Sequence, residues 1–177
     1  SHFIFGDVAT AVILESEDTV TSDNAYNVLS TKAFTQFSSN IRSNHGYLNR
    51  ANDTDPYGAD KLFHQEGRKV FKDVCPLAAE HIKGHLAKHD LTPASLTRWW
   101  LHQANLNMNT LISKRLLGRE ATKEEAPIVL DRYANTASAG SVIAFSLYNE
   151  DLVRGDYGIL CSFGAGYSIG SLLVQKR

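Results

Sequence analysis

The first part of the chain carries two segments whose residue types predict neighbouring strands. Residues 3–15 and 25–35 are rich in β-branched and aromatic side chains, and the polar residues 22–24 between them favour a turn. We therefore expect a hairpin. Residues 36–58 are polar and show no hydrophobic period, so they predict a long loop, and such a loop in a compact domain typically covers a site or a partner.

A long helix is predicted over residues 59–89, where apolar side chains recur at helical spacing. Pro76 lies inside this segment. Because proline lacks the backbone N–H and its ring collides with the preceding turn, we expect a kink or a break after Cys75. Thr92 and Pro93, which follow the helix, are typical of another helix start.

The remaining segments predict further strands and helices. Residues 98–101 predict a buried strand, and residues 107–117 predict an amphipathic helix that ends at Gly118. Residues 137–149 are apolar or small on nearly every side. A helix without a polar face is covered on both sides, so we expect this helix to lie between two layers.

Two terminal strands, residues 157–163 and 167–174, complete the pattern. The order of elements is two strands, a long helix, a strand, a helix, a buried helix and two strands. This order predicts an α/β fold with a mixed five-stranded sheet and helices on both faces.

Composition narrows the class of protein. The 177 residues are 43% hydrophobic and carry 18 Lys and Arg against 19 Asp and Glu, which predicts a globular domain, or half of a larger one, with no patch for nucleic acid or a membrane surface. The apolar runs, such as residues 142–145, are far too short to cross a bilayer. The start of the chain lacks the pattern of a signal peptide. With two cysteines and no disulfide framework, we expect a reducing, cytoplasmic location.

Histidines recur every four residues on the predicted long helix. His81, His85 and His89 therefore share one face, as metal ligands do on helices. No Cys or Glu stands at ligand spacing, and Lys83 and Lys88 lie nearby. We expect a solvated face and no metal site.

Two other patterns resemble ligand-binding motifs only in part. Gly164, Gly166 and Gly170 begin like a dinucleotide fingerprint, but a strand follows them where that motif needs a helix and a later acidic residue. These glycines predict a tight turn and a close backbone approach. Residues 53–55 begin like a calcium loop, but proline comes next and histidine replaces the glutamate at the twelfth position.

The candidate chemistry lies at His102 and Asn135. Each stands just after a strand-like segment or just before a helix, where an open α/β sheet presents side chains at its edge. A histidine and an asparagine together supply two N–H donors to one developing oxyanion, which suits enolate chemistry. The alternative, which spacing alone favours, is a structural histidine and a helix-capping asparagine.

The chain resembles the C-terminal half of the β-ketoacyl-acyl-carrier-protein synthase III family, which are condensing enzymes of the thiolase fold. The resemblance runs through nearly the whole chain. It is carried by five motifs in order: F-G-D-V-A-T-A-V-I-L (5–14), E-G-R-K-V-F-K (66–72), L-T-P-A-S-L-T-R-W-W-L-H-Q-A-N (91–105), N-T-A-S-A-G-S (135–141) and F-G-A-G-Y-S-I-G (163–170).

This resemblance implies a reaction and its residues. His102 and Asn135 correspond to two members of a Cys-His-Asn triad, and Asn105, Gly164 and Gly166 fall in the motifs around the substrate. In the family, the cysteine takes an acyl group from acyl-CoA, and malonyl-carrier loses CO2 to an enolate that attacks this thioester. Coenzyme A thioester is thus a substrate, no further cofactor or metal is expected, and the carrier protein is a partner.

The family's cysteine nucleophile belongs to an N-terminal half that these residues do not include. Cys75 and Cys161 lie within a predicted helix and a predicted strand, so we expect inert core thiols. We therefore interpret residues 1–177 as the C-terminal half of a homodimeric enzyme, inactive alone. The alternatives are a non-catalytic acyl-binding or assembly half, and an acyltransferase to an alcohol or amine.

Four positions depart from the family's pattern, and one of them is Ala165, which stands between Gly164 and Gly166 where the family has a triple glycine. Val8 and Thr10 replace two glycines of the first motif. Asn107 stands where many members carry a basic residue that helps to dock the carrier protein. These departures indicate a specialised relative, and the sequence names neither its acyl chain nor its acceptor.

Overall fold

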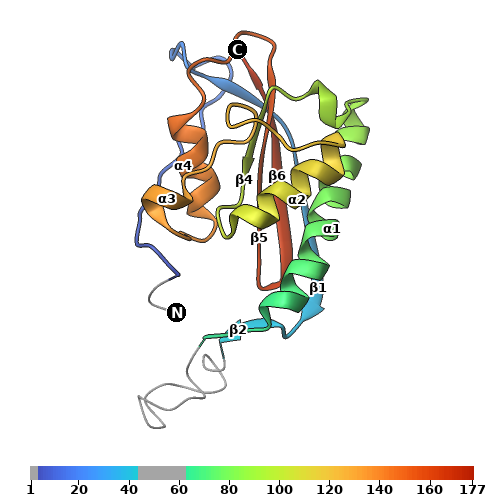
Figure 1. Cartoon of the computed structure of the whole chain (residues 1–177). Helices are drawn as coiled ribbons and strands as arrows, with labels where there is room; N and C mark the ends of the chain where they lie inside the picture. The colour runs from blue at the N-terminus through green and yellow to red at the C-terminus, as the bar shows by residue number, and fades with distance from the viewer. Residues whose placement is uncertain (1–3, 44–62) are drawn as a thin grey trace.

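Helices cover both faces of a single main sheet (Figure 1). The computed structural model describes residues 4–43 and 63–177. Helices α1 (Gly67–Leu86) and α2 (Leu106–Leu117) pack together on one face, and α4 (Ala139–Leu147) packs on the other. The predicted α/β architecture with helices on both faces is confirmed. Within the described residues, no helix is both long and apolar enough to span a membrane.

Among the described residues the sheet has four strands, in the order β1-β6-β5-β4, and not the five that we expected. Strand β4 runs parallel to β5, and the other two pairings are antiparallel, which makes the sheet mixed as predicted. Four of the five predicted strands are present. Their bounds are β1 (Tyr26–Ser38), β4 (Arg98–Leu101), β5 (Tyr157–Gly164) and β6 (Gly166–Lys176).

The missing strand is the segment over residues 3–15. Its described part forms only one isolated bridge, between Phe5 and Asn135, and the predicted hairpin with β1 is absent. Val12, Ile13 and Leu14 are exposed by 60%, 85% and 79%. Residue types express a preference for extended backbone, but a strand also needs a partner edge and a surface that buries one side.

The polar stretch predicted as a loop over residues 36–58 is partly strand. Strand β1 continues to Ser38, and β2 (Ile41–Ser43) pairs with β3 (Phe63–Gln65) in a separate two-stranded sheet. Residues 44–62 lie outside the described residues, and so do residues 53–55 with their partial calcium pattern.

Helix α1 begins at Gly67, later than predicted, and continues past Pro76 without a break. Proline removes one hydrogen bond of the helix, and burial of apolar side chains on both sides of it offsets that loss. Val74, Cys75 and Ala78 are almost fully buried around Pro76. Tertiary packing therefore overrides the local preference for a break.

Successive side chains of β5 point to opposite faces of the sheet, so the core has one part on each face. Ile159 and Cys161 join the cluster under α1 and α2, whereas Leu160 packs with the cluster around α4. Trp100 of β4 anchors that second cluster, with its ring 4.9 Å from the ring of Phe145. Every residue of β4 is buried, as predicted.

Short elements connect these layers. The 3₁₀ turns η3 (Ala87–His89) and η4 (Pro93–Ser95) lead from α1 to β4, and the second is capped reciprocally by Thr92 and Ser95, which confirms a helical start there. Helix α2 ends at Gly118 with a φ of 73°, as predicted. The short helix α3 (Leu130–Tyr133) precedes α4.

Helix α4 is covered on one side only by the described residues. Gly140, Ser141, Ile143 and Ala144 are buried, whereas Leu147 is 43% exposed. The expected position between two layers is therefore not met within this part of the chain.

Candidate functional site

His102 directly follows strand β4 and is buried at the end of the sheet. Its ring lies 4.6 Å from the ring of Phe163 in β5, and its Nδ1 atom has no hydrogen-bond partner among the described residues. Burial lowers the pKa of His102 to about 4. The imidazole is therefore neutral at pH 7, with one N–H to donate and one nitrogen to accept.

Asn135 lies in the loop between α3 and α4, flanked by two alanines in an unusual backbone conformation. Ala134 has a φ of 55° and Ala137 a φ of 53°, a region that costs free energy for a residue with a Cβ. The Asn135 Oδ1 atom accepts a hydrogen bond of 2.9 Å from the Ala137 N–H. This bond orients the amide so that its Nδ2 group remains as a donor. Asn135 is not the N-cap of α4, because that position belongs to Ser138.

The first sequence motif holds the Asn135 backbone in place. The Gly6 N–H donates to the Asn135 carbonyl at 3.0 Å, and the Asn135 N–H donates to the Ile4 carbonyl at 3.1 Å. A Cβ on Gly6 would lie 2.1 Å from the Tyr133 carbonyl oxygen, so only glycine fits. The role of this motif is thus local: it fixes the loop that carries Asn135.

His102 and Asn135 come from segments that meet at one end of the sheet, although no hydrogen bond joins the two. Because β4 and β5 are parallel, His102 lies at the same edge as the end of β5. The start of α4 reaches this edge too, since Ser162 of β5 donates to the Ser138 carbonyl at 3.5 Å. The convergence of the two side chains on one oxygen remains a prediction.

The three predicted substrate-binding residues occupy the same region in different roles. Asn105 is the exposed N-cap of α2, and its side chain accepts from the Asn107 N–H at 2.8 Å. Gly164 and Gly166 flank the turn between β5 and β6. Gly166 has a φ of 134°, and a Cβ there would lie 2.7 Å from Ser168, which confirms the expected need for glycine at this position. A Cβ on Gly164 would have no neighbouring atom within 4 Å.

Two buried polar residues beside this site were not predicted. Thr136 is buried, and its Oγ1 atom has no hydrogen-bond partner among the described residues. Gln103 is fully buried. Their positions in the sequence, next to Asn135 and His102, are the one feature that points to them. The burial of a polar side chain depends on tertiary contacts that residue types do not reveal.

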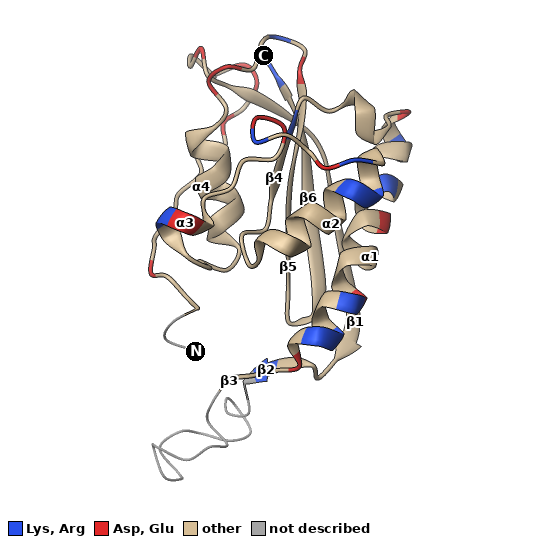
Figure 2. Ribbon diagram, in the orientation of Figure 1, with Lys and Arg blue, Asp and Glu red and all other residues tan. Residues whose placement is uncertain are grey.

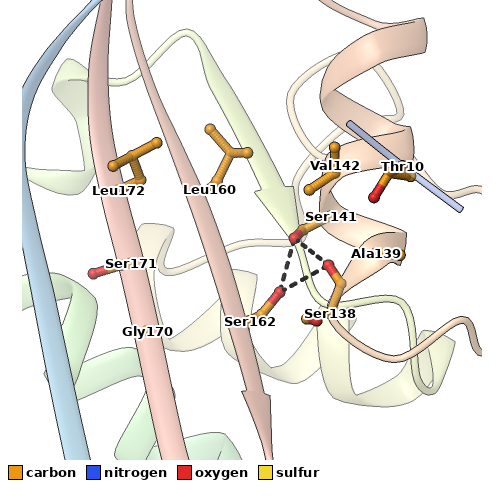
Figure 3. A pocket seen from close by; sticks show the side chains of 10 residues that line it. All are labelled: Thr10, Ser138, Ala139, Ser141, Val142, Leu160, Ser162, Gly170, Ser171 and Leu172. Carbon is orange, nitrogen blue, oxygen red and sulfur yellow. Dashed lines mark hydrogen bonds between the residues drawn. The ribbon is translucent and has the colours of Figure 1, made fainter. Parts of the chain in front are cut away.

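A hollow opens between α4 and the sheet, and serines line much of it (Figure 3). Its volume is about 390 Å³. The Ser141 hydroxyl lies 2.7 Å from that of Ser162 and donates to the Ser138 carbonyl at 3.0 Å. Thr10, one of the residues that depart from the family pattern, faces the same space (Figure 3).

His81 and His85 of α1 are buried and His89 of η3 is partly buried, so the expectation of a solvated face is wrong. The Ser30 hydroxyl lies 2.7 Å from His85 Nε2 and 2.6 Å from His89 Nε2, and the Ser171 hydroxyl lies 2.8 Å from His81 Nε2 and 2.7 Å from His85 Nδ1. This face of α1 therefore packs against β1 and β6. Within residues 4–43 and 63–177, no group of three or more His, Cys, Asp or Glu side chains is placed to hold a metal ion.

Both cysteines are buried, free thiols. Burial raises the pKa of Cys75 to about 11 and that of Cys161 to about 12. A thiol that stays protonated at neutral pH is a poor nucleophile, so the geometry agrees with inert core cysteines.

The chain is similar in sequence to β-ketoacyl-[acyl-carrier-protein] synthases. The chain is 58% identical over 177 residues to the β-ketodecanoyl-[acyl-carrier-protein] synthase of Pseudomonas aeruginosa, covering all of this chain and 51% of that protein. It is 35% identical over 121 residues to β-ketoacyl-[acyl-carrier-protein] synthase III 1 of Lactiplantibacillus plantarum, covering 68% of this chain and 36% of that protein. The chain thus spans at most about half the length of these relatives.

A solved structure shows the same fold. The crystal structure of 3-oxoacyl-[acyl-carrier-protein] synthase III from Aquifex aeolicus matches with a TM-score of 0.69 at 20% identity, covering 88% of this chain and 46% of that one. The thiolase-like fold is therefore confirmed. A family model described as 3-oxoacyl-[acyl-carrier-protein] synthase III C terminal matches residues 86–176, which is more than half of the chain. The chain belongs to the 3-oxoacyl-[acyl-carrier-protein] synthase III family.

Proposed function

We propose that this chain supplies the enolate-stabilising half of a condensing enzyme, with His102 and Asn135 as the two donors. In this reaction the bond between the malonyl carbon and its carboxylate breaks, CO2 leaves, and the electron pair forms an enolate on the thioester. The enolate carbon then attacks an acyl-cysteine thioester, and the cysteine leaves as a thiolate. Two N–H donors near the enolate oxygen lower the barrier to the first step.

One observation carries this proposal: both side chains are prepared as neutral donors. Burial keeps the His102 imidazole uncharged. The Ala137 N–H donates to the oxygen of the Asn135 amide, which leaves the amide nitrogen as the donor. A neutral donor does not lose its proton to the enolate as readily as an imidazolium does. The strained backbone around Asn135 adds support, because such conformations gather at functional sites.

The nucleophile in this proposal comes from an N-terminal half, since Cys75 and Cys161 are buried and protonated. That half would pack on the α4 side. Helix α4 contains no charged residue, whereas α1 and α2 both contain Lys and Arg residues (Figure 2). An uncharged face with the serine-lined hollow beside it suits a buried interface, and a charged face suits solvent.

The name of the Pseudomonas aeruginosa relative indicates the acyl chain. A decarboxylative condensation adds two carbons, so a β-ketodecanoyl product needs an eight-carbon acyl donor. At 58% identity over the whole of this chain, we extend this product to the present protein. The carrier protein is proposed as the partner that delivers the malonyl group.

Asn107 favours a second candidate for the acceptor. It is exposed in the first turn of α2, where a basic side chain would help to dock the carrier protein. An enzyme with weak carrier docking would transfer its acyl group to an alcohol or amine. Condensation remains the first proposal because the similar proteins are named β-ketoacyl-[acyl-carrier-protein] synthases.

The test is reconstitution with an N-terminal half that carries the cysteine. We expect the reconstituted enzyme to form an octanoyl-enzyme, detected by mass spectrometry, and to condense octanoyl and malonyl groups. His102→Ala should leave acylation intact and reduce condensation about 10²- to 10³-fold. Full condensation by the His102→Ala enzyme, or acylation of Cys75 or Cys161, would contradict the proposal.

A further inference from the structure

Gln103 uses every polar atom of its side chain inside the protein. Its Nε2 group donates to the Leu101 carbonyl at 2.9 Å and to the Pro127 carbonyl at 3.3 Å, and its Oε1 atom accepts from the Val129 N–H at 3.0 Å. The residue is fully buried. It thereby joins the end of β4 to the segment that leads into α3.

The stem of the same side chain packs against the first turn of α4. A Cβ on Gly140 would lie 2.7 Å from the Gln103 Cβ and 3.0 Å from its Cγ. Side-chain atoms cannot approach so closely, so only glycine allows this contact. Gln103 therefore touches three segments that are distant in sequence: the end of β4, residues 127–129 and the start of α4.

These three segments lie directly beside, or on either side of, the two proposed donors along the chain. His102 precedes Gln103 directly, and Asn135 lies between Val129 and Gly140 on the chain. No hydrogen bond joins His102 to Asn135, so the distance between them depends on what connects their backbones. Gln103 makes that connection through two hydrogen bonds, with Pro127 and Val129, and through one close packing contact with Gly140.

We infer that Gln103 is a positioning residue that sets the separation of the His102 and Asn135 donors. This inference rests on the proposed function. Each donor must lie about 3 Å from the enolate oxygen, and a displacement of about 1 Å at such a site costs about 10²-fold in rate. Loss of the Gln103 amide should thus weaken decarboxylation and leave acylation of the cysteine unchanged.

The experiment measures malonyl decarboxylation and cysteine acylation separately in the reconstituted enzyme. Gln103→Met keeps the length of the side chain and removes its hydrogen bonds, and Gly140→Ala pushes α4 away from Gln103. We expect both to reduce decarboxylation about 10²-fold, with acylation within about threefold of the unchanged enzyme. Gln36→Met and Gly67→Ala, both exposed and the second without neighbours within 4 Å, are the matched controls.

Gln103→Glu adds a signature that a loss of stability alone does not produce. When protonated, the new carboxyl group donates to Leu101 or Pro127 and accepts from Val129, as the amide does. When ionised, it faces two carbonyl oxygens. The ratio of decarboxylation to acylation should therefore fall more steeply with rising pH in Gln103→Glu than in the unchanged enzyme. This variant decides the question even where Gln103→Met fails to fold.

The outcomes separate this inference from the proposed function. If His102→Ala loses decarboxylation while Gln103→Met, Gly140→Ala and Gln103→Glu keep it, Gln103 does not position the donors. Equal losses of acylation and decarboxylation in these variants would also overturn the inference, because they indicate a general structural role. If His102→Ala itself keeps decarboxylation, the proposed function fails.

Discussion

The donor end of the Asn135 amide is the group in the site where the smallest chemical change has the largest expected effect. Asn135→Asp keeps the oxygen that accepts from the Ala137 N–H, so the loop should retain its shape. It replaces the donor with a negatively charged acceptor. We expect decarboxylation of malonyl-carrier by the reconstituted enzyme to fall about 10²- to 10³-fold, with acylation within a few fold.

Carbon dioxide release and mass spectrometry of the acyl-enzyme measure these two steps. Asn27→Asp, on β1 and outside the site, is the matched control. A parallel loss of both steps in Asn135→Asp would show that Asn135 acts on more than the enolate.

A second single-residue substitution, at Asn107, is expected to improve the enzyme. Its exposed position at the start of α2 leaves room for a longer side chain. Asn107→Arg should lower the KM for malonyl-carrier several-fold and leave kcat unchanged, because a rim charge acts mainly on association. Steady-state kinetics at low and high salt measure the effect, and Gln36→Arg on exposed β1 controls for net charge. An unchanged KM would indicate that the carrier does not approach this end of α2.

The sequence predicts candidate donors for the site more readily than the residues that support them. His102 and Asn135 are predicted because they stand in motifs that resemble those of the family, and their roles stay a prediction. Gln103 and Thr136 are not predicted, because their burial arises only when β4, the α3 segment and α4 come together. The orientation of the Asn135 amide depends likewise on backbone angles at Ala134 and Ala137 that a sequence does not show.

At the level of elements, three histidines of α1 and η3 contact two serines of the sheet, Ser30 on β1 and Ser171 on β6. His81 is the most deeply affected of the histidines: burial first, then Lys32 and His85, lowers its pKa from 6.5 to about 4. Burial and the charges of His89, Lys32 and Lys88 also lower the pKa of His85. The folded chain thus holds the His81 and His85 rings neutral at a pH where the same residues in an unfolded chain would bind protons.

This difference predicts how stability depends on pH. Between pH 6.5 and about 4 the unfolded chain holds more protons than the folded one, so the free energy of unfolding should fall as the pH falls through this range. His81 alone accounts for at most roughly 3 kcal/mol. His81→Gln removes the titration, so its urea-unfolding free energy should vary less with pH, whereas His64→Gln in β3 should behave as the unchanged chain. An identical slope for His81→Gln would refute this origin.

The predicted elements agree with the structure where the segment packs against other described parts of the chain. The long helix, β4, α2 and the two last strands match their predicted positions because each buries its apolar face against neighbours within the described chain. Residues 3–15 failed since no described surface covers Val12 or Leu14. The predicted break of the helix at Pro76 is absent, because the packing of α1 stabilises the helix by more than the loss of one hydrogen bond costs.

For the whole molecule, the exposed apolar side chains predict association of the isolated chain. Ile13, Leu14 and Leu147 are all at least 43% exposed, and monomeric proteins rarely leave such surface in water. We expect the chain alone to self-associate in sedimentation experiments and to bind a hydrophobic dye. An N-terminal half should suppress both, because it would cover α4.

Variants locate the surface responsible. Leu147→Lys should reduce dye binding and self-association, whereas Val153→Lys, in a turn and 66% exposed, should not. A monomeric chain that binds no dye would contradict the proposed missing partner half.

The edge of β1 has a consequence for aggregation. An unpaired strand edge is a template for further strands, and Val28, Phe34 and Phe37 along β1 are exposed. The pairing of β1 with β6 is irregular between Val28 and Ser30 and again between Thr35 and Ser38, which leaves a short stretch, residues 26–28, and a longer one, residues 30–35, in unbroken register. Lys32 lies within the longer stretch. Edge-to-edge growth into fibrils would therefore stall, and chains that lose their partner should form amorphous clusters rather than ordered filaments.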